Sequence, residues 1–286
     1  MNNLKVWLNK AKTGHFALGA FNADTFETMK AVAKAAAVKK SPVILEISAG
    51  EEKFLGMQNV LAVKNNLAKE YQIPIFLNLD HADDLDTILN AIELGFDLVH
   101  FDGGKLPLEE NIRIAKEVVD SAHGKEVLVE GEIDHFPGSS ELHNEEKASD
   151  FTKIFTDPEK AAQFVKETGV DIFAAFIGNM HGVYNEEVRL DLDRLEKITA
   201  AVPETFLSLH GGSGTYQDDV KRAIAAGIGK VNINTELRLK YRETLENVLK
   251  GNPDEVKMDK IFTPVIEAVE GVVEDKIDLL GSTGLV

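Results

Sequence analysis

The stretch Pro74-Ile-Phe-Leu-Asn-Leu-Asp-His-Ala-Asp-Asp84 is the part of this sequence that best indicates the fold. An apolar run of strand length ends abruptly in Asp80 and His81, and apolar residues then recur at helical spacing from Leu85 to Ile92. In α/β proteins, catalytic groups lie where buried parallel strands end and the connections to the following helices begin. The stretch therefore predicts a parallel sheet with a functional site near Asp80 and His81.

Seven further apolar runs of strand length occupy residues 17–23, 42–48, 98–103, 126–133, 171–178, 205–212 and 230–235. Helical patterns lie between the runs, at residues 25–38, 60–70, 86–94, 108–122, 158–168, 191–201 and 218–226. Continuous rather than alternating hydrophobicity indicates strands covered on both faces, as in a parallel sheet. Eight such units predict an α/β fold of the (β/α)8 TIM barrel type, and the absence of a G-x-G-x-x-G or Walker A motif argues against a doubly wound nucleotide-binding sheet.

The ends of the chain add helices to this barrel. Residues 4–11 form an amphipathic pattern that we expect to cap the bottom of the barrel, and residues 237–249 and 254–273 predict a C-terminal helical extension. No linker, repeat or low-complexity tract divides the chain, so we expect one (β/α)8 barrel domain over residues 1–286. The irregular stretch 134–156 is long enough to be a functional loop or lid.

Composition excludes several classes of function. The net charge is −17 and the Lys and Arg residues are dispersed, which argues against nucleic acid and anionic membranes as partners. The absence of cysteine excludes disulfides and thiolate chemistry. No apolar run approaches the ~20 residues of a membrane span, and no secretory signal is evident, so the expected compartment is the cytoplasm.

Polar residues stand at the carboxyl ends of the predicted strands, which converge on one face of a barrel. They are Asn22, Ser48, Asp80, His81, Asp102, Glu132, His181, His210 and Asn232. Burying such groups costs free energy unless they have a partner or a function. Neutral imidazoles suit zinc, and three protein ligands leave an open coordination position for catalysis. Because three of these residues are histidines from three strands, we predict a catalytic Zn²⁺ held by His81, His181 and His210.

Each of these residues also has an ordinary interpretation when taken alone. A strand-end Asp often caps the following helix, and a lone His is usually a hydrogen-bonded residue of the core. The remaining histidines are interpreted as structural or solvated, and we expect the side chain of His100 on the opposite face of its strand from Phe101. These five residues are His15, His100, His123, His135 and His143.

Two loops predict a phosphate site. One predicted strand runs into His210-Gly-Gly-Ser-Gly214, and the last runs into Asn232-Ile-Asn-Thr-Glu236, which opens a helix. Barrels frequently bind phosphate with the loops after their last two strands, through backbone N–H groups and a helix N-terminus. The alternative is that the glycines only form a tight turn. An amide-lined phosphate site beside a zinc ion would make a positive spot on a negative molecule.

Taken together and in order, these motifs resemble the class II, metal-dependent ketose-bisphosphate aldolases of the fructose-1,6-bisphosphate and tagatose-1,6-bisphosphate group. The resemblance covers nearly the whole chain. Its motifs are Ala20-Phe-Asn22, Leu79-Asp-His81, Phe101-Asp-Gly103, Val129-Glu-Gly-Glu132, Ile177-Gly-Asn-Met-His-Gly182, Leu209-His-Gly-Gly-Ser213, Val231-Asn-Ile-Asn-Thr235 and Gly281-Ser-Thr-Gly284.

The resemblance implies a role for each candidate residue. His81, His181 and His210 would hold the zinc, and Asp102 and Glu132 would belong to a neighbouring position for the metal, a second divalent ion or a monovalent cation. Asp80 would exchange the proton of the aldehyde-derived oxygen. Substrate contacts would come from Asn22, Ser48, Gly182, Gly211, Gly212, Ser213, Asn232, Ile233, Asn234 and Thr235. The resemblance further implies a phosphorylated ketose substrate, a glycolytic role and a homodimer or homotetramer.

The sequence departs from the family at three points. Asn78 stands where relatives usually have histidine, and Met180 departs from the usual residues before the second histidine. In the irregular loop, Glu141 is the nearest candidate for the glutamate that handles the substrate C–H proton, about one residue out of register. Fructose and tagatose stereochemistry are not distinguished by these residues.

Three other functions stay open as alternatives. A metal-dependent barrel hydrolase often carries His-x-His on its first strand, which here ends in Phe21-Asn22. A non-catalytic sugar-phosphate binder would keep the pocket without the lid base. Schiff-base catalysis needs a lysine at the carboxyl end of a strand. Lys125 and Lys230 are expected before their strands, at the wrong face, and Lys105 lies in a loop.

Overall fold

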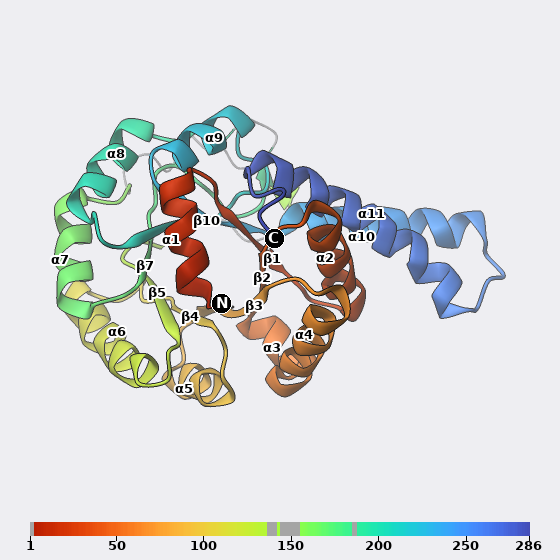
Figure 1. Ribbon diagram of the computed structural model, residues 1–286, viewed down its shortest axis with the longest axis horizontal. Coiled ribbons are helices and arrows are strands. Elements are labelled where there is room, and N and C mark those ends of the chain that lie inside the picture. The colour runs from red at the N-terminus through yellow and green to blue at the C-terminus, as the bar shows by residue number, and fades with distance from the viewer. Residues whose placement is uncertain (1–2, 136–141, 144–154, 185–187) are drawn as a thin grey trace.

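A computed structural model of the chain describes residues 3–135, 142–143, 155–184 and 188–286 (Figure 1). Eight parallel strands form a closed barrel in the order β1-β10-β9-β7-β5-β4-β3-β2. They are β1 (Leu18–Asn22), β2 (Val43–Ser48), β3 (Ile75–Ala82), β4 (Leu98–Phe101), β5 (Leu128–Glu132), β7 (Ile172–Ala174), β9 (Phe206–Leu209) and β10 (Ile228–Ile233). A separate small sheet pairs β6 (Leu142–His143) with β8 (Val183–Tyr184). The predicted (β/α)8 barrel is confirmed.

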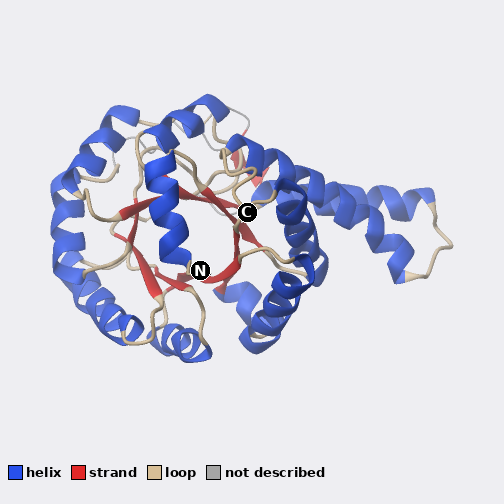
Figure 2. Ribbon diagram, viewed as in Figure 1, coloured by secondary structure: helices blue, strands red, loops and turns tan. Residues whose placement is uncertain are grey.

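Helices surround the barrel and also close one end of it (Figure 2). They are α1 (Leu4–Gly14), α2 (Phe26–Lys39), α3 (Ala49–Leu55), α4 (Met57–Tyr71), α5 (Leu85–Leu94), α6 (Leu108–His123), α7 (Pro158–Thr168), α8 (Leu192–Ala201), α9 (Gln217–Ala225), α10 (Thr235–Gly251) and α11 (Met258–Leu279). Helices α10 and α11 pair with each other and extend as a hairpin away from the barrel (Figure 1). Among the described residues, no helix combines the length and apolarity that crossing a membrane requires.

Local sequence explains where several helices begin. Thr25 and Asp84 each accept a hydrogen bond from the backbone N–H three residues later, at the starts of α2 and α5. At α7, Asp157 caps the first turn and Pro158 supplies a φ angle suited to that position. Each of these caps follows a strand or loop on the same side of the barrel. Capping therefore fixes where the chain turns from strand to helix around the predicted site.

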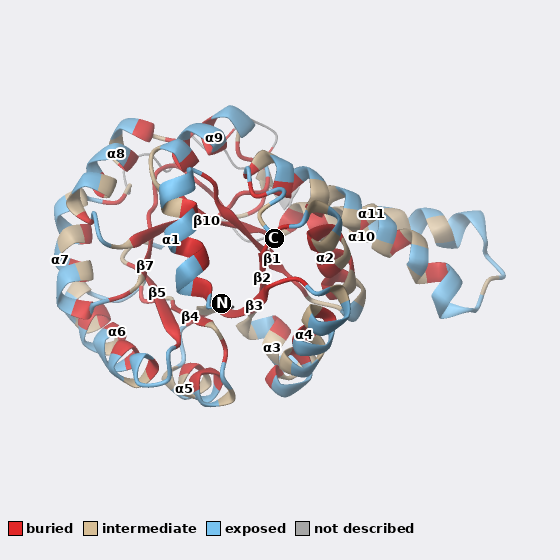
Figure 3. Ribbon diagram, viewed as in Figure 1, coloured by how far each residue is buried: buried red, intermediate tan, exposed pale blue. Residues whose placement is uncertain are grey.

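Inward-facing residues divide the barrel interior into layers, because side chains alternate along each strand. The layer farthest from the strand carboxyl ends is apolar and fully or nearly fully buried, and α1 seals it with Leu4, Trp7, Leu8 and Ala11 (Figure 3). Its barrel residues are Leu18, Ile44, Phe76, Leu98, Leu128, Ile172 and Phe206. Helix α1 covers this apolar surface, which explains why the N-terminal helix predicted from the sequence caps the barrel.

The middle layer of the barrel interior is polar. It contains Lys230, which the sequence analysis had placed before its strand. This residue lies within β10 rather than before it, and its fully buried side chain forms ion pairs with Glu46 and Glu130 inside the barrel. The sequence prediction was wrong because the strand begins two residues earlier, at Ile228. Lys230 still lies one layer below the strand ends, away from the position that a Schiff-base lysine needs.

Replacing Leu8, which is buried between α1 and the barrel, tests whether α1 seals the apolar end of the barrel. We expect Leu8→Ala to lower the free energy of unfolding by about 2–5 kcal/mol, because it opens a cavity against the apolar layer. The control is Val6→Ala on the exposed side of the same helix, where 43% of Val6 is accessible. Urea denaturation measures both variants. Equal and small losses would show that α1 does not seal the barrel.

Candidate active site

The predicted site residues meet at the carboxyl ends of the barrel strands, in two adjoining pockets. The first is lined by Asn22, Asp80, His81, His181, Gly182, Gly211, Ser213, Asn232, Asn234 and Thr235. The second has a volume of about 310 Å³ and is lined by Asn22, Ser48, Asp80, His81, Asp102, Glu132, His135, His181, Asn234 and Arg238. Of the remaining predicted residues, His210 is buried beside these pockets, and Gly212 and Ile233 adjoin pocket residues in the chain. Glu141 lies outside the described residues.

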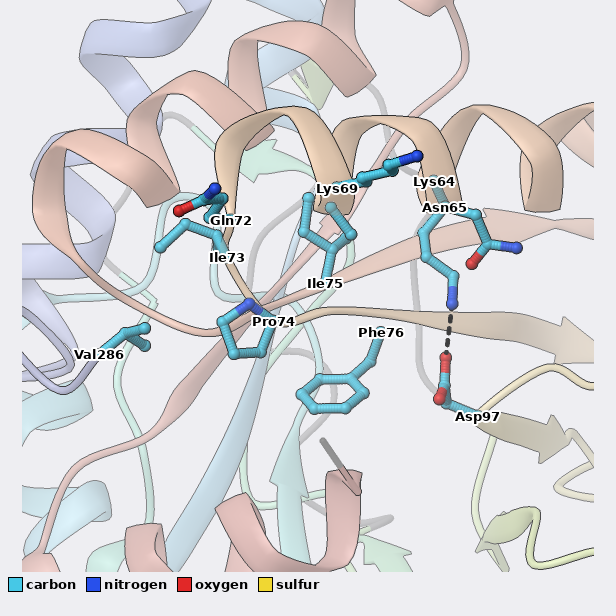
Figure 4. Close-up of a pocket in the computed structure, with 11 residues that line it drawn as sticks. Lys64, Asn65, Lys69, Gln72, Ile73, Pro74, Ile75, Phe76, Asp97 and Val286 are labelled. Carbon is cyan, nitrogen blue, oxygen red and sulfur yellow. Dashed lines mark hydrogen bonds and ion pairs between the residues drawn. The ribbon is translucent and has the colours of Figure 1, made fainter. Parts of the chain in front are cut away.

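A larger cavity, of about 460 Å³, lies at the opposite face (Figure 4). It is formed by the end of α4 and the start of β3, together with Val286, and the side chain of Lys64 reaches Asp97 across it. The lysine Nζ is 3.3 Å from the carboxylate Oδ2, so this charge is already paired. Strand amino ends contribute to stability rather than chemistry in barrels of this type, and the polar side chains of this cavity do not converge on a point.

The rings of the three predicted zinc histidines lie near one another, although His181 belongs to neither of the two groups whose possible ligand atoms lie within 4.8 Å of one another. The ring centroid of His81 is 4.7 Å from that of His210 and 4.9 Å from that of His181, and the His181 and His210 centroids are 6.0 Å apart. His81 follows Asp80 directly, so strand alternation alone would turn one of the two away. A register shift between Leu79 and Ala82 and a positive φ of 48° at His81 let both side chains reach the site.

Each of two imidazoles is held on one side by a carboxylate. His81 Nδ1 is 3.0 Å from Asp102 Oδ2, and His210 Nε2 is 2.8 Å from Glu130 Oε1. The other two nitrogens, His81 Nε2 and His210 Nδ1, face each other at 2.9 Å. If both rings donate their N–H to the carboxylates, two lone pairs meet, which requires a proton or a metal cation between them. Orienting carboxylates of this kind accompany most metal-ligating histidines, so the donor set fits a zinc-like ion.

His100 joins this cluster, although the sequence analysis treated it as structural or solvated. It is completely buried, with Nδ1 3.5 Å from Asp80 Oδ1 and Nε2 3.4 Å from Glu132 Oε2. Ligand atoms of Asp80, His81, His100 and His210 lie within 4.8 Å of one another, as do those of His81, Asp102 and Glu132. The signal that could have found His100 is its spacing of two residues from Asp102, which gives both the same strand face.

The electrostatics of the cluster are set mainly by burial. Burial raises the pKa of Glu132 to about 8 and lowers the pKa of His210 to about 4. The pKa of His181 is also lowered well below its usual value by burial and by the neighbouring histidines. Burial disfavours the charged form of Asp80, yet His81 and His100 hold the pKa of this carboxyl well below its usual value. Asp80 is therefore ionised, and His181 and His210 are neutral. Burial opposes the charge of His81 and His100, but Asp80 and the neighbouring carboxylates raise the pKa of both residues above the usual value.

The predicted phosphate loops surround the first pocket. At Gly211, φ is 66° and an added Cβ would lie 2.1 Å from the Met180 carbonyl oxygen, so only glycine fits. Asn234 stands at the N-cap of α10, and Thr235 begins that helix. Asn234 Oδ1 and Thr235 Oγ1 are buried without a hydrogen-bond partner in the described part of the chain. The Thr235 hydroxyl can donate a hydrogen bond, and its place beside a helix N-terminus and a glycine turn suits an anionic ligand.

Two predicted substrate residues also have structural partners. The Ser48 backbone N–H donates to Glu51 Oε2 at 2.7 Å, at the start of α3, and Asn22 Nδ2 donates to the same oxygen at 3.3 Å. Arg238, which the sequence analysis did not select, pairs with Asp24 and Glu51 at the edge of the second pocket. No pattern in the sequence marks Arg238, because it lies one helical turn after the strand-end motif.

Comparison with known proteins agrees with this geometry. The sequence model of the family described as fructose-bisphosphate aldolase class-II matches residues 2–285. The fructose-bisphosphate aldolase of Streptococcus pneumoniae is 35% identical over 294 residues, with 97% of each chain covered. That of Streptococcus pyogenes serotype M3 is 38% identical over 290 residues, with 96% of each covered.

Solved structures of aldolases superpose on nearly the whole chain. The YdjI aldolase from Escherichia coli K12 has a TM-score of 0.84 at 32% identity, and a putative fructose-1,6-biphosphate aldolase from Coccidioides immitis has a TM-score of 0.86 at 28% identity. Each match covers 99% of this chain and 98% of the other. The resemblance found in the sequence is confirmed: this chain is an aldolase that belongs to the metal-dependent class II fructose-bisphosphate aldolase family.

Proposed function

We propose that this enzyme reversibly cleaves fructose 1,6-bisphosphate to dihydroxyacetone phosphate and glyceraldehyde 3-phosphate, in the cytoplasm and as a step of glycolysis. Tagatose 1,6-bisphosphate or another phosphorylated ketose is the alternative substrate. The observation that carries the proposal is the pair of facing nitrogens on His81 and His210, 2.9 Å apart beside Asp80 and the glycine-lined loop at Gly211. Neither a metal-dependent barrel hydrolase nor a non-catalytic sugar-phosphate binder would explain why this combination of residues occurs in a member of an aldolase family.

We propose Zn²⁺ as the metal, with His81, His181 and His210 as its ligands. Asp102 and Glu132 would serve a neighbouring position for the same ion, a second divalent ion or a monovalent cation. When bound, the metal acts as a Lewis acid that stabilises negative charge on the ketone half of the substrate. The carboxylates behind His81 and His210 would hold the ring N–H on the far nitrogen, so that the other nitrogen of each ring faces the metal position.

Asp80 is the proposed acid–base residue. Its carboxylate lies next to His81 and accepts a hydrogen bond from Asn232 Nδ2 at 3.2 Å. Because its pKa is held low, Asp80 is ready to accept the C4 hydroxyl proton in cleavage and to return it in condensation. The Asn232 amide is placed to donate to the developing oxyanion. Glu141 remains the proposed residue for the proton on the ketone α-carbon.

The loops of the first pocket are proposed to hold the phosphate of the dihydroxyacetone phosphate half. Backbone N–H groups at a glycine turn and a helix start bind such oxygens without needing a net positive protein. The residues proposed for this contact are Gly182, Gly211, Gly212, Ser213, Asn232, Ile233, Asn234 and Thr235. Asn22 and Ser48, which line the second pocket, are proposed to contact the rest of the substrate. Thr235 Oγ1, which has no hydrogen-bond partner among the residues that the structure describes, supports this assignment.

A homodimer or homotetramer is proposed from the α10–α11 hairpin. This hairpin extends from the barrel and leaves Leu249, Val256 and Met258 with 45%, 78% and 59% of their surfaces accessible (Figure 3). Exposed apolar side chains grouped in this way are typical of association surfaces. Oligomers of identical chains usually bury such a surface symmetrically.

Chelation tests the metal and the substrate together. We expect EDTA to abolish cleavage of fructose 1,6-bisphosphate and Zn²⁺ or Co²⁺ to restore it, because the metal would supply the Lewis acid that stabilises negative charge on the ketone half of the substrate. A coupled assay run in parallel on tagatose 1,6-bisphosphate measures the preference between substrates. A metal-replete preparation that cleaves neither compound, nor any related phosphorylated ketose, would sink the proposed function.

The variant Asp80→Asn tests the proposed acid–base role. We expect kcat to fall by about 10²- to 10⁴-fold, because an amide of the same size cannot accept the proton. Asp83→Asn is the control, since Asp83 directly follows β3, three residues after Asp80, but is exposed. Steady-state kinetics on metal-loaded protein measures both variants. Similar activity of the two would place proton transfer elsewhere.

The variant Val256→Asp with Met258→Asp tests association through the hairpin. We expect the wild-type chain to be a dimer or tetramer and the double variant to shift toward monomer, because the two charges cannot be buried in an apolar interface. Light scattering coupled to gel filtration measures the mass of each. A wild-type monomer at micromolar concentration would contradict the proposal.

A further inference from the structure

A buried ammonium group lies directly beneath the site. Lys230 is completely inaccessible, and its Nζ is 2.7 Å from Glu46 Oε1, 2.9 Å from Glu130 Oε2 and 2.7 Å from Asn232 Oδ1. The contact with Asn232 is a hydrogen bond that the ammonium donates, and the contacts with the two carboxylates are ion pairs. Burial opposes the charge, but Glu130 and Glu46 raise the pKa of Lys230 above its usual value. The group is therefore a fixed cation with a fixed orientation.

Through Glu130, Lys230 is linked to the proposed metal ligand His210. Lys230 binds Oε2 of Glu130, which leaves Oε1 to accept from Ser208 Oγ at 2.6 Å and to face His210 Nε2 at 2.8 Å. The carboxylate accepts the imidazole N–H, so His210 carries its proton on Nε2. The lone pair of Nδ1 then faces His81, where the metal is proposed to bind.

Lys230 also contacts Asn232, whose amide is proposed to donate a hydrogen bond to the oxyanion. Because an ammonium only donates, the Asn232 atom next to Lys230 Nζ is the carbonyl oxygen Oδ1. The amide nitrogen Nδ2 is consequently turned toward the site, where it lies 3.2 Å from Asp80 Oδ1 and 3.4 Å from His210 Nδ1. A rotated amide would present an acceptor to the substrate oxyanion instead of a donor.

We propose that Lys230 is a positioning residue that sets both the tautomer of His210 and the orientation of the Asn232 amide. It lies below the substrate and the metal and acts through Glu130 and Asn232. Its effect on catalysis rests on the proposed function, whereas its effects on His210 and on metal affinity do not. The competing interpretation is that Lys230 only neutralises two buried carboxylates, which would affect stability alone.

The single variant Lys230→Met would leave Glu46 and Glu130 buried without their cation, so its main effect would be on folding. The test therefore uses Lys230→Met combined with Glu46→Gln, which removes one positive and one negative charge together. Three properties are measured: Zn²⁺ affinity by competition with a chelator, the ¹⁵N shifts of the His210 ring in metal-free protein, and kcat and KM on fructose 1,6-bisphosphate.

We expect the double variant to bind Zn²⁺ about 10- to 100-fold more weakly. We expect the His210 ring to lose its single Nε2–H tautomer and kcat to fall more than KM rises. Lys64→Met is the matched control, because Lys64 is also a largely buried lysine paired with a carboxylate, Asp97, at the opposite end of the barrel (Figure 4). It should lose stability and keep wild-type metal affinity.

A folded double variant with Zn²⁺ affinity within twofold of wild type and an unchanged His210 tautomer would overturn the proposal. Glu130→Gln provides a second test, because it breaks the link to His210 while Lys230 keeps Glu46 and Asn232. Retention of the Nε2–H tautomer and of metal affinity in that variant would overturn the proposal in the same way. If the wild type cleaves no ketose bisphosphate, the proposed function fails, but the tautomer and affinity measurements still decide the role of Lys230.

Discussion

The requirement that every charge inside the barrel be paired governs this structure. Side chains alternate along eight parallel strands, so each strand that ends in a reactive residue also sends the residue two positions earlier into the interior. On β5 and β10 these deeper residues are Glu130 and Lys230, which form an ion pair of 2.9 Å with no access to solvent. Ions buried this deeply are stable only when their partners are well placed. The apolar layer sealed by α1 keeps water from reaching them from below.

The pairing in the interior also accounts for the direction of the donors above it. Glu130 holds one nitrogen of His210, so the other must face the site, and Lys230 holds the oxygen of Asn232, so the amide N–H groups must do the same. These orientations do not depend on flexible loops, because both residues are on or directly after barrel strands. A site preorganised in this way has less reorganisation to complete during the reaction. The same buried ion pairs that stabilise the barrel interior therefore also orient the groups of the site above them.

Much of the fold and the site could be predicted from the sequence, since apolar runs ending in polar residues mark strand ends regardless of packing. Asp80, His81, His210 and the two loops predicted to bind phosphate follow from that rule, whereas His181 lies in the connection well after the end of β7. His100 and Lys230 were missed because a continuous apolar run does not show which face of the strand points inward, and only their spacing of two residues from Asp102 and Asn232 marks that face. The orientation of His81 depends on a register shift beside Ala82, which leaves no mark in the sequence. Glu141 lies in a stretch without periodicity, where no rule applies.

Charge balance gives a final reason for a cation at this site. The carboxyl groups of Glu46, Asp80, Glu130 and Glu132 are all buried, and the first three lie near the ammonium of Lys230. Asn78, at the position where the family usually has histidine, donates a neutral amide N–H to Glu46 at 2.8 Å and adds no positive charge. Protons must supply the missing charge when no metal is bound, which agrees with the pKa of about 8 that burial gives Glu132. A divalent ion would replace those protons, so its affinity should fall as the pH falls.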